Sequence, residues 1–348
     1  MLHLLTLILF FDFETGLTYQ PLPEDSEEYL SGPAGFVFGG DGKLYLMDSI
    51  TSRIHVWDAE GKYLFSFGKK GEGPGEFTYP ALIDIDERHL WVLDSRGVLS
   101  QLDHKGNYIK AFRVNKPRLR RFSVLQENRF LVTTREQVTP TEIYNRIEIL
   151  DDQGETVTLI KKWRNESFTT PREDNNYASV KAFPPACEIQ RGPDGYWYIG
   201  FSQNSKLYRV DAKGEIRDEL SLGIPGEEPT DEEEAMFAEL ALPCLGGSFK
   251  FKDFPNIHTD FDHNKAYYTS YAVQDDRIVF ALTPDGGVFG CNGFPKGNYF
   301  VCDRKTGALL DRGSFEFPEG SLLYFHHGHV LGIIIDDEDE FEVRQIKF

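Results

Sequence analysis

The segment "NIHTDFDHNK" (256–265) carries the densest set of potential metal-ligand side chains in this sequence. Imidazole nitrogens and carboxylate oxygens bind divalent cations such as Ca²⁺ and Zn²⁺. Alternate residues of a β-strand lie on the same side, so His258, Asp260 and Asp262 would face one way. Solvated polar groups at the centre of the fold are the preferred interpretation of this segment, and a Ca or Zn site is the alternative.

A second cluster of imidazoles stands in "FHHGH" (325–329), with His326, His327 and His329. Histidines this close in sequence are common zinc ligands. An apolar run follows, however, so we expect the cluster in a turn between two strands, on the face with the shorter connections. An exposed polar turn is the preferred interpretation, and metal binding is the alternative.

The sequence lacks the motifs of a nucleophilic serine site and of a phosphate-binding loop. The stretch "GFSQN" (200–204) lacks the second glycine of a nucleophile elbow. A phosphate-binding loop needs a lysine after its last glycine and a helix next. In "FGKKGEGPGEF" (67–77), Lys69 and Lys70 precede most of the glycines and a strand-like run follows. This stretch is predicted to be a corner between two structural units, and catalytic residues stay unassigned.

Charge and composition exclude further classes. The 348 residues carry 37 basic and 56 acidic side chains, a net charge of −19, which repels phosphate backbones and excludes nucleic acid as a partner. The basic run "KPRLRR" (116–121) is either a solvated, neutralising patch or an anion site. None of the four cysteines shows the C-x-x-C spacing of zinc ribbons or thioredoxins.

Two turn patterns recur along the chain, and the strands that they connect must position the candidate ligand side chains. The first precedes an apolar strand, and its six copies open at Lys43, His89, Arg129, Tyr196, Lys265 and His329. The closest copies are 40 and 46 residues apart. The second pattern places Asp three residues before Gly, which suits a tight hairpin. It occurs at Asp58/Gly61, Asp103/Gly106, Asp151/Gly154 and Asp211/Gly214, with a looser copy at Asp303/Gly307.

Units of this length with four strands each predict an all-β, six-bladed β-propeller with four-stranded antiparallel blades in one domain of residues 1–348. The last unit ends with "FEVRQIKF" (341–348), one strand short, so we expect the N-terminal "LTLILFFDFE" (5–14) to close the ring. A signal-peptide core is the alternative for this segment. The predicted blades span about 32–77, 78–121, 122–165, 184–225, 255–317 and 319–348 with 3–14.

The first unit resembles an NHL repeat of bacterial six-bladed propeller proteins, and carries their "FG-x-x-GEGPGEF" junction. Its matching positions are Gly42, Tyr45, Asp48, Arg53, Ile54, Val56, Asp58, Gly61 and Phe67. The resemblance implies a propeller, a group that includes peptide-amidating lyases, sugar lactonases and non-catalytic interaction modules. It also implies export to the periplasm or outside the cell. The catalytic members hold a metal at the channel mouth, and no such ligand set aligns with this chain.

The long connections predict where a ligand would bind. Segments 133–145, 165–185, 224–255 and 271–298 all fall on one face of a propeller, the loop-rich face. Candidate binding residues there are Arg135, Tyr144, Arg172 and Phe237. We expect a monomeric, non-catalytic module that binds a protein, peptide or glycan, with no membrane span. The alternative is a metal-dependent lyase or lactonase that uses His258 and Asp260 at the channel mouth.

Overall fold

The computed structural model describes residues 15–23, 29–114, 116, 119–138, 143–164, 168–169, 178–181, 187–226, 228, 230–231, 257–260, 267–282, 296–316, 321–335 and 341–347. Nearly all of the regular structure in these ranges is β-strand, with one 3₁₀ turn at Gln126–Asn128. None of the described helical segments has the length and hydropathy of a membrane span.

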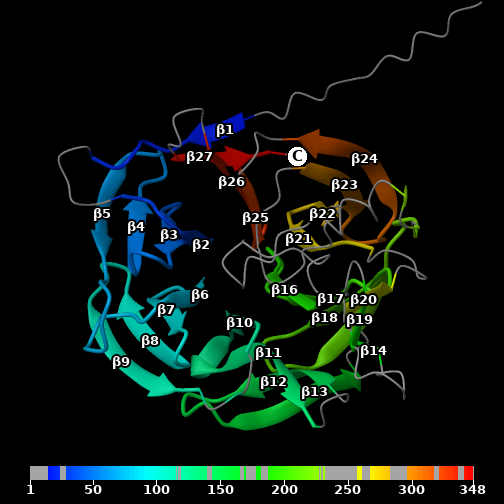
Figure 1. Cartoon of the computed structure of the whole chain (residues 1–348), viewed down its shortest axis with the longest axis horizontal. Helices are drawn as coiled ribbons and strands as arrows, with labels where there is room; N and C mark the ends of the chain where they lie inside the picture. Colours follow the sequence, from blue (N-terminus) through cyan, green and yellow to red (C-terminus); the bar gives the residue numbers. More distant parts are fainter. Residues whose placement is uncertain are drawn as a thin grey trace, which may run out of the picture.

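Six four-stranded antiparallel sheets form a ring around a central axis, which confirms the predicted six-bladed propeller (Figure 1). Blade one has β2 (Pro33–Phe38), β3 (Leu44–Asp48), β4 (Arg53–Trp57) and β5 (Tyr63–Phe67); blade two has β6 (Pro80–Ile85), β7 (His89–Asp94), β8 (Val98–Asp103) and β9 (Tyr108–Arg113). Blade three has β10 (Arg121–Val124), β11 (Phe130–Gln137), β12 (Ile143–Leu150) and β13 (Thr156–Arg164); blade four has β16 (Cys187–Arg191), β17 (Trp197–Phe201), β18 (Lys206–Val210) and β19 (Ile216–Ser221). Blade five has β21 (Ser270–Val273), β22 (Arg277–Leu282), β23 (Lys296–Asp303) and β24 (Leu309–Glu316); blade six has β25 (Leu322–His326), β26 (His329–Ile335), β27 (Phe341–Ile346) and β1 (Thr15–Thr18).

The N-terminal part of the chain closes the ring, as the missing strand predicted. The strand that pairs with β27 is β1, with Thr15 opposite Ile346 and Thr18 opposite Arg344. It therefore begins after the predicted segment 5–14, which lies outside the described residues. Trp57 of blade one fastens this closure by donating its indole N–H to the carbonyl of Gln20 at 2.8 Å.

The innermost strand and the first turn predicted within blade five are wrong. Its innermost strand is β21 and its first turn follows Val273, whereas the sequence pattern placed the innermost strand near His258 and the first turn before Lys265. Both inner strands of a blade are buried, so an apolar run such as residues 266–273 fits either of them by pattern alone. The predicted spans of the six blades contain the observed strands, except for Arg121 at the edge of blade three and for β1, which follows the segment 3–14 predicted for blade six.

Six hydrophobic clusters of described residues each lie between two neighbouring blades and hold the ring together. Between blades two and three, for example, Trp91 packs edge-on against Phe130 with ring centroids 4.9 Å apart. Burial of such a side chain contributes about 1.5–3 kcal/mol. The ring is therefore stabilised chiefly at the junctions between blades.

The Asp-x-x-Gly hairpins form as predicted. In blade two the Gly106 N–H donates to the Asp103 carbonyl at 3.0 Å, and Gly106 adopts a φ of +83°. A Cβ on Gly106 would lie 2.3 Å from the Phe67 ring of blade one. This glycine therefore serves the turn and the packing between blades at once.

We expect Gly106→Ala to lower the free energy of unfolding by about 2–4 kcal/mol, because left-handed backbone strain adds to the clash with Phe67. Gly195→Ala is the matched control, since Gly195 has a φ of +79° but no atom within 4 Å of an added Cβ. It should cost only about 1–2 kcal/mol of backbone strain. Equal losses for the two variants in urea unfolding would contradict the packing role of Gly106.

Candidate functional site

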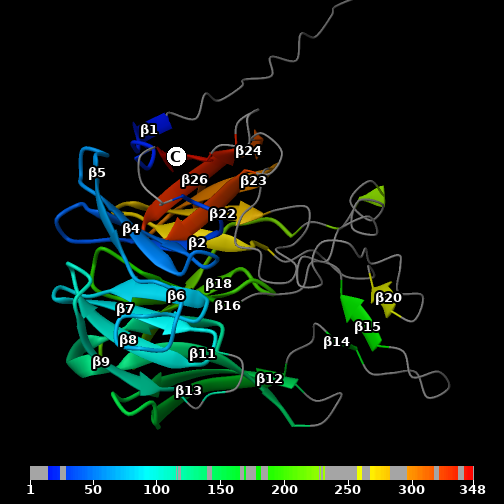
Figure 2. The ribbon, with the colours of Figure 1, turned by 60° about the vertical axis from the view of Figure 1, so that its left-hand side comes forward.

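The long connections of two blade junctions pair with each other outside the ring. Strand β14 (Phe168–Thr169) is antiparallel to β15 (Ala178–Lys181), and β15 is parallel to β20 (Ile257–Asp260). Figure 2 shows this small sheet standing apart from the six blades. Strands from the connection between blades three and four thus pair with a strand from the connection between blades four and five.

This sheet displaces the predicted metal ligands. His258 and Asp260 lie in β20, opposite Ser179 and Lys181, and not in the innermost strand of blade five. Asp262 lies outside the described residues. Because β20 belongs to no blade, the structure does not bring this segment to the central axis as the prediction required.

Two of the predicted loop-face residues are described. Arg135 and Tyr144 lie on paired strands, where Tyr144 is opposite Glu136. The ammonium group of Lys162 lies 4.5 Å from the Tyr144 ring centroid. Arg172 and Phe237 lie outside the described residues. The binding role of all four stays a prediction.

A buried polar site lies on the opposite face, the turn face, where the first and second strands of each blade are joined. At its centre the Asp84 carboxylate of β6 is only 1% exposed. Its Oδ2 accepts from the Ser123 hydroxyl at 2.9 Å and the Val124 N–H at 2.7 Å. Its Oδ1 accepts from the Ile85 N–H at 2.8 Å and lies 3.2 Å from His327 Nε2.

The turn that joins β25 to β26, which we call the axial turn (His326–His329), reaches this carboxylate from blade six. His327 has a φ of +44°, unusual for a residue with a side chain. Its backbone N–H donates to the Gln190 side-chain oxygen, and its Nδ1 accepts from the Arg191 N–H at 2.8 Å. His327 thereby joins blades two, four and six, no two of which are neighbours, so it lies over the axis of the ring.

The hydrogen bonds of His327 define its tautomer. Because Nδ1 accepts from a backbone N–H, the proton of the neutral ring is on Nε2 and is donated to Asp84. Burial alone would raise the pKa of Asp84, but the neighbouring His327 and the hydrogen bond that it makes hold this pKa below its usual range.

His326 lies beside this contact without sharing it. Its ring stacks on His327 with centroids 3.8 Å apart, and its Nε2 is buried without a hydrogen bond, 3.9 Å from Asp84 Oδ1. Burial and the neighbouring His327 lower the pKa of His326 to about 4, although Asp84 acts in the opposite direction. His326 is therefore neutral at neutral pH.

Asp84, His326 and His327 offer ligand atoms within 4.8 Å of one another, so we tested them against metal chemistry. Zinc takes such nitrogen and oxygen ligands at about 2.0–2.2 Å. A neutral histidine that binds metal through Nε2 must carry its proton on Nδ1, where it donates to an outer partner. The Nδ1 of His327 instead accepts from Arg191, so this donor set does not fit a bound metal.

Ser123 does not supply a nucleophile in this cluster. Its hydroxyl donates to Asp84 and accepts from the Trp197 indole N–H at 2.9 Å. The His327 Nε2 is 3.5 Å away and points its proton at the carboxylate. A catalytic serine needs a base that accepts its proton. The geometry therefore gives Ser123 a structural role between blades two, three and four.

The sequence does contain a signal for this site, although sequence reasoning missed it. Asp84, Ser123 and Gln190 occupy one register position of the innermost strand in three consecutive blades, opposite Trp91, Leu131 and Tyr198. The equivalent residues of the other three blades are apolar: Val37, Ala272 and Tyr324. Three polar residues at one repeat position of a core-facing strand indicate a shared polar centre.

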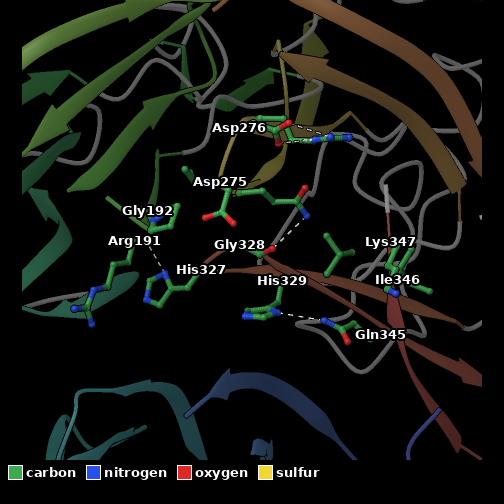
Figure 3. A pocket seen from close by; sticks show the side chains of 15 residues that line it. Arg191, Gly192, Asp275, Asp276, His327, Gly328, His329, Gln345, Ile346 and Lys347 are labelled. Carbon is green, nitrogen blue, oxygen red and sulfur yellow. Dashed lines mark hydrogen bonds and ion pairs between the residues drawn. The ribbon is translucent and has the colours of Figure 1, made fainter. Parts of the chain in front are cut away.

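An open pocket of about 640 Å³ adjoins the axial turn. Its walls come from the first turns of blades four, five and six and from the end of β27, including Arg191, Asp275, His327, His329 and Lys347 (Figure 3). Burial lowers the pKa of His329 to about 4. The pocket presents both charges to solvent, next to the buried contact of His327.

Two described side chains of the basic run at 116–121, Lys116 and Arg121, make ion pairs. Lys116 lies 3.8 Å from the buried Glu148, and Arg121 makes a two-pronged contact with Glu188 at 2.7 and 2.8 Å. The Arg121 contact joins blades three and four. These pairs support the neutralising interpretation of this segment.

Residues 15–177 match the model of a protein family described as "6-bladed beta-propeller". A comparison with curated proteins finds no match. Among solved structures, the chain is similar to a putative exported protein from Bacteroides fragilis NCTC 9343, with 12% identity, 95% of this chain and 94% of that chain covered, and a TM-score of 0.58.

More distant structures include virginiamycin B lyase from Staphylococcus aureus, with 12% identity over 91% of this chain and 95% of that one and a TM-score of 0.41. The WD40 domain of Pan2 from Neurospora crassa has 10% identity over 90% and 89%, with a TM-score of 0.42. At these identities the Bacteroides structure supports the fold alone. By its strand order the chain has the fold of a six-bladed β-propeller, and its residues 15–177 match a family of that description.

Proposed function

We propose that this chain is a non-catalytic binding propeller that presents its loop-rich face to a protein, peptide or glycan. The observation that carries this proposal is the sheet of β14, β15 and β20, in which two separate connections pair with each other. Links between blades need only a few residues. Ordering extra chain costs conformational entropy, which favours a dedicated surface over a simple linker.

The extension of blade three on the same face also supports this proposal. Strands β11 and β12 have eight residues each, whereas β3 and β4 of blade one have five. The extra pairs lead toward the connection on the loop-rich face. There Glu136 accepts from Lys162 at 2.8 Å and lies 3.6 Å from Arg146, which fixes the extended strands.

The test is binding of the full-length chain to a glycan array and to a displayed random-peptide library. We expect a recurring ligand class whose affinity falls at least about tenfold in Tyr144→Ala and in Val138→Ser, two changes at the extended hairpin. Arg277→Ala and Lys347→Ala on the turn face are the matched controls and should bind normally. The proposal fails if neither panel yields a ligand, or if only the turn-face changes weaken binding.

Metal content distinguishes the alternative, a metal-dependent lyase or lactonase. Because Nδ1 of His327 accepts from Arg191 and β20 lies outside the blades, we expect the thermal midpoint to be the same with and without EDTA. Elemental analysis of the purified protein should find no stoichiometric Ca or Zn. One retained ion per chain, with a thermal midpoint that falls on chelation, would favour the metal-dependent lyase or lactonase over the binding propeller.

A further inference from the structure

The His327 ring stands between two partners that require different things of it. On one side, Nε2–H donates to the Asp84 carboxylate of blade two; on the other, Nδ1 accepts from the Arg191 N–H of blade four. The neutral ring has one donor and one acceptor, so it satisfies both. An imidazolium has two donors and no acceptor. One added proton is therefore incompatible with one of the two contacts.

We propose that the axial turn is a pH-sensitive latch: protonation of His327 breaks its bond to the Arg191 N–H of blade four while the contact to blade two is kept, and this loosens the pocket wall on the turn face. The added proton goes to Nδ1, where it would face the Arg191 N–H. Two N–H groups cannot bond to each other, so the Arg191 amide must move away. The contact with Asp84 becomes an ion pair and strengthens.

The groups that face His327 are Asp84 of blade two, Ser123 of blade three, Gln190 and Arg191 of blade four, and the stacked His326. The stacked His326 stays neutral between pH 7.5 and 5, since burial lowers its pKa to about 4. Ser123 of blade three and Gln190 of blade four are uncharged. The Arg191 guanidinium lies over the Trp197 ring at 5.5 Å, and Asp275 and Lys347 lie on the pocket wall. An ordinary histidine titrates within this interval.

The released contact forms part of the pocket wall. Arg191, Gly192 and Pro193 line one side, and His327 and Gly328 line the adjacent side. The bond between Arg191 and His327 joins these two turns next to the bond of Gln190, so its loss loosens the pocket wall at Arg191. The positive φ of His327 adds backbone strain that favours release.

The experiment follows the full-length, ¹⁵N-labelled protein by NMR between pH 7.5 and 5. At pH 7.5 we expect the His327 proton on Nε2. On acidification the protection factor of the Arg191 amide against hydrogen exchange should fall at least about fivefold, because one hydrogen bond is lost. The protection factor already corrects for the intrinsic exchange rate at each pH. The Ile85 amide, bound to Asp84, is the internal reference and should keep its protection.

His327→Asn is the key variant, because asparagine tolerates positive φ and its Oδ1 can accept from Arg191 without titrating. Arg191 protection should then be independent of pH, while His329→Asn, which changes another pocket histidine, should behave as the unaltered protein. Unchanged Arg191 protection in the unaltered protein, or an equal fall in His327→Asn, would overturn the latch. If His327→Asn does not fold, the NMR signals of the His327 ring in the unaltered protein provide the test. A ring that stays in the neutral Nε2–H form down to pH 5 contradicts the proposal.

Discussion

Asp84→Ala is expected to lower the free energy of unfolding by about 3–5 kcal/mol, the cost of removing one partner from a buried charged contact. The carboxylate is 1% exposed and accepts from donors on blades two, three and six. Its removal leaves the Val124 N–H and the His327 Nε2–H buried without an acceptor. Each such group costs about 1–3 kcal/mol. Urea unfolding at pH 7 measures the loss.

Asp84→Asn separates the effect of the negative charge from that of the size and shape of the side chain. The amide keeps the size and one acceptor oxygen, but its NH₂ group faces N–H donors, so we expect a smaller but still substantial loss. Asp275→Asn on the exposed pocket wall is the control and should change stability by less than about 0.5 kcal/mol. If Asp84→Asn were as stable as the unaltered chain, the carboxylate would not hold the blades together.

The same carboxylate makes stability depend on acid pH, with a defined sign. The pKa of Asp84 is lower in the folded protein than its ordinary value of about 3.9. The folded state thus binds fewer protons, and the contribution of Asp84 is complete above pH 4 and is lost as the pH falls through the folded pKa. Below pH 4 the unaltered chain should therefore lose stability more steeply than Asp84→Asn.

The ring therefore combines two kinds of stabilisation. Apolar clusters join each blade to its neighbours, and they act around the circumference. The bonds of Asp84, Gln190 and His327 join blades that are not neighbours, and they act across the axis. A change in the second set can loosen the centre of the turn face while the circumference stays intact, as the proposed latch requires.

The repeat architecture could be predicted because its signals are local. A turn such as Asp103–Gly106 encodes its own geometry within four residues, and the hydrogen bonds and positive φ of that turn follow from the two residue types. The strands predicted within blade five were wrong for the opposite reason. Its long connections interrupt the repeat, and a buried run around Tyr268 and Tyr271 does not reveal which inner strand it forms.

The polar site was harder to predict than the fold because its parts are far apart in sequence. Asp84 and His327 are separated by 243 residues, and nothing near Asp84 distinguishes it from a surface aspartate. The histidine cluster was visible, but its tautomer depends on the Arg191 N–H of another blade. Alignment of the blades by register, rather than a search for ligand spacings, is what brings Asp84, Ser123 and Gln190 together.

Tyr19→Ala tests whether the N-terminal segment is part of the folded ring, and we expect a loss of about 3–5 kcal/mol, typical of a deleted buried aromatic side chain. Tyr19 follows β1 and is 3% exposed. Its N–H donates to the Val343 carbonyl of β27 at 2.9 Å, and its ring meets the edge of Trp57 at 6.1 Å. The side chain thus joins the last blade to the first.

Tyr29→Ala is the matched control for this closure. Tyr29 is 63% exposed, so its loss should change stability by less than about 0.5 kcal/mol. Urea unfolding of the two variants compares the same substitution inside and outside the closure. Equal stability of Tyr19→Ala and Tyr29→Ala would mean that β27 does not depend on its N-terminal partner. A loss of stability in Tyr19→Ala alone would mean that the pairing of β1 with β27 stabilises the ring at its circumference, in addition to the contacts of the axial turn across its axis.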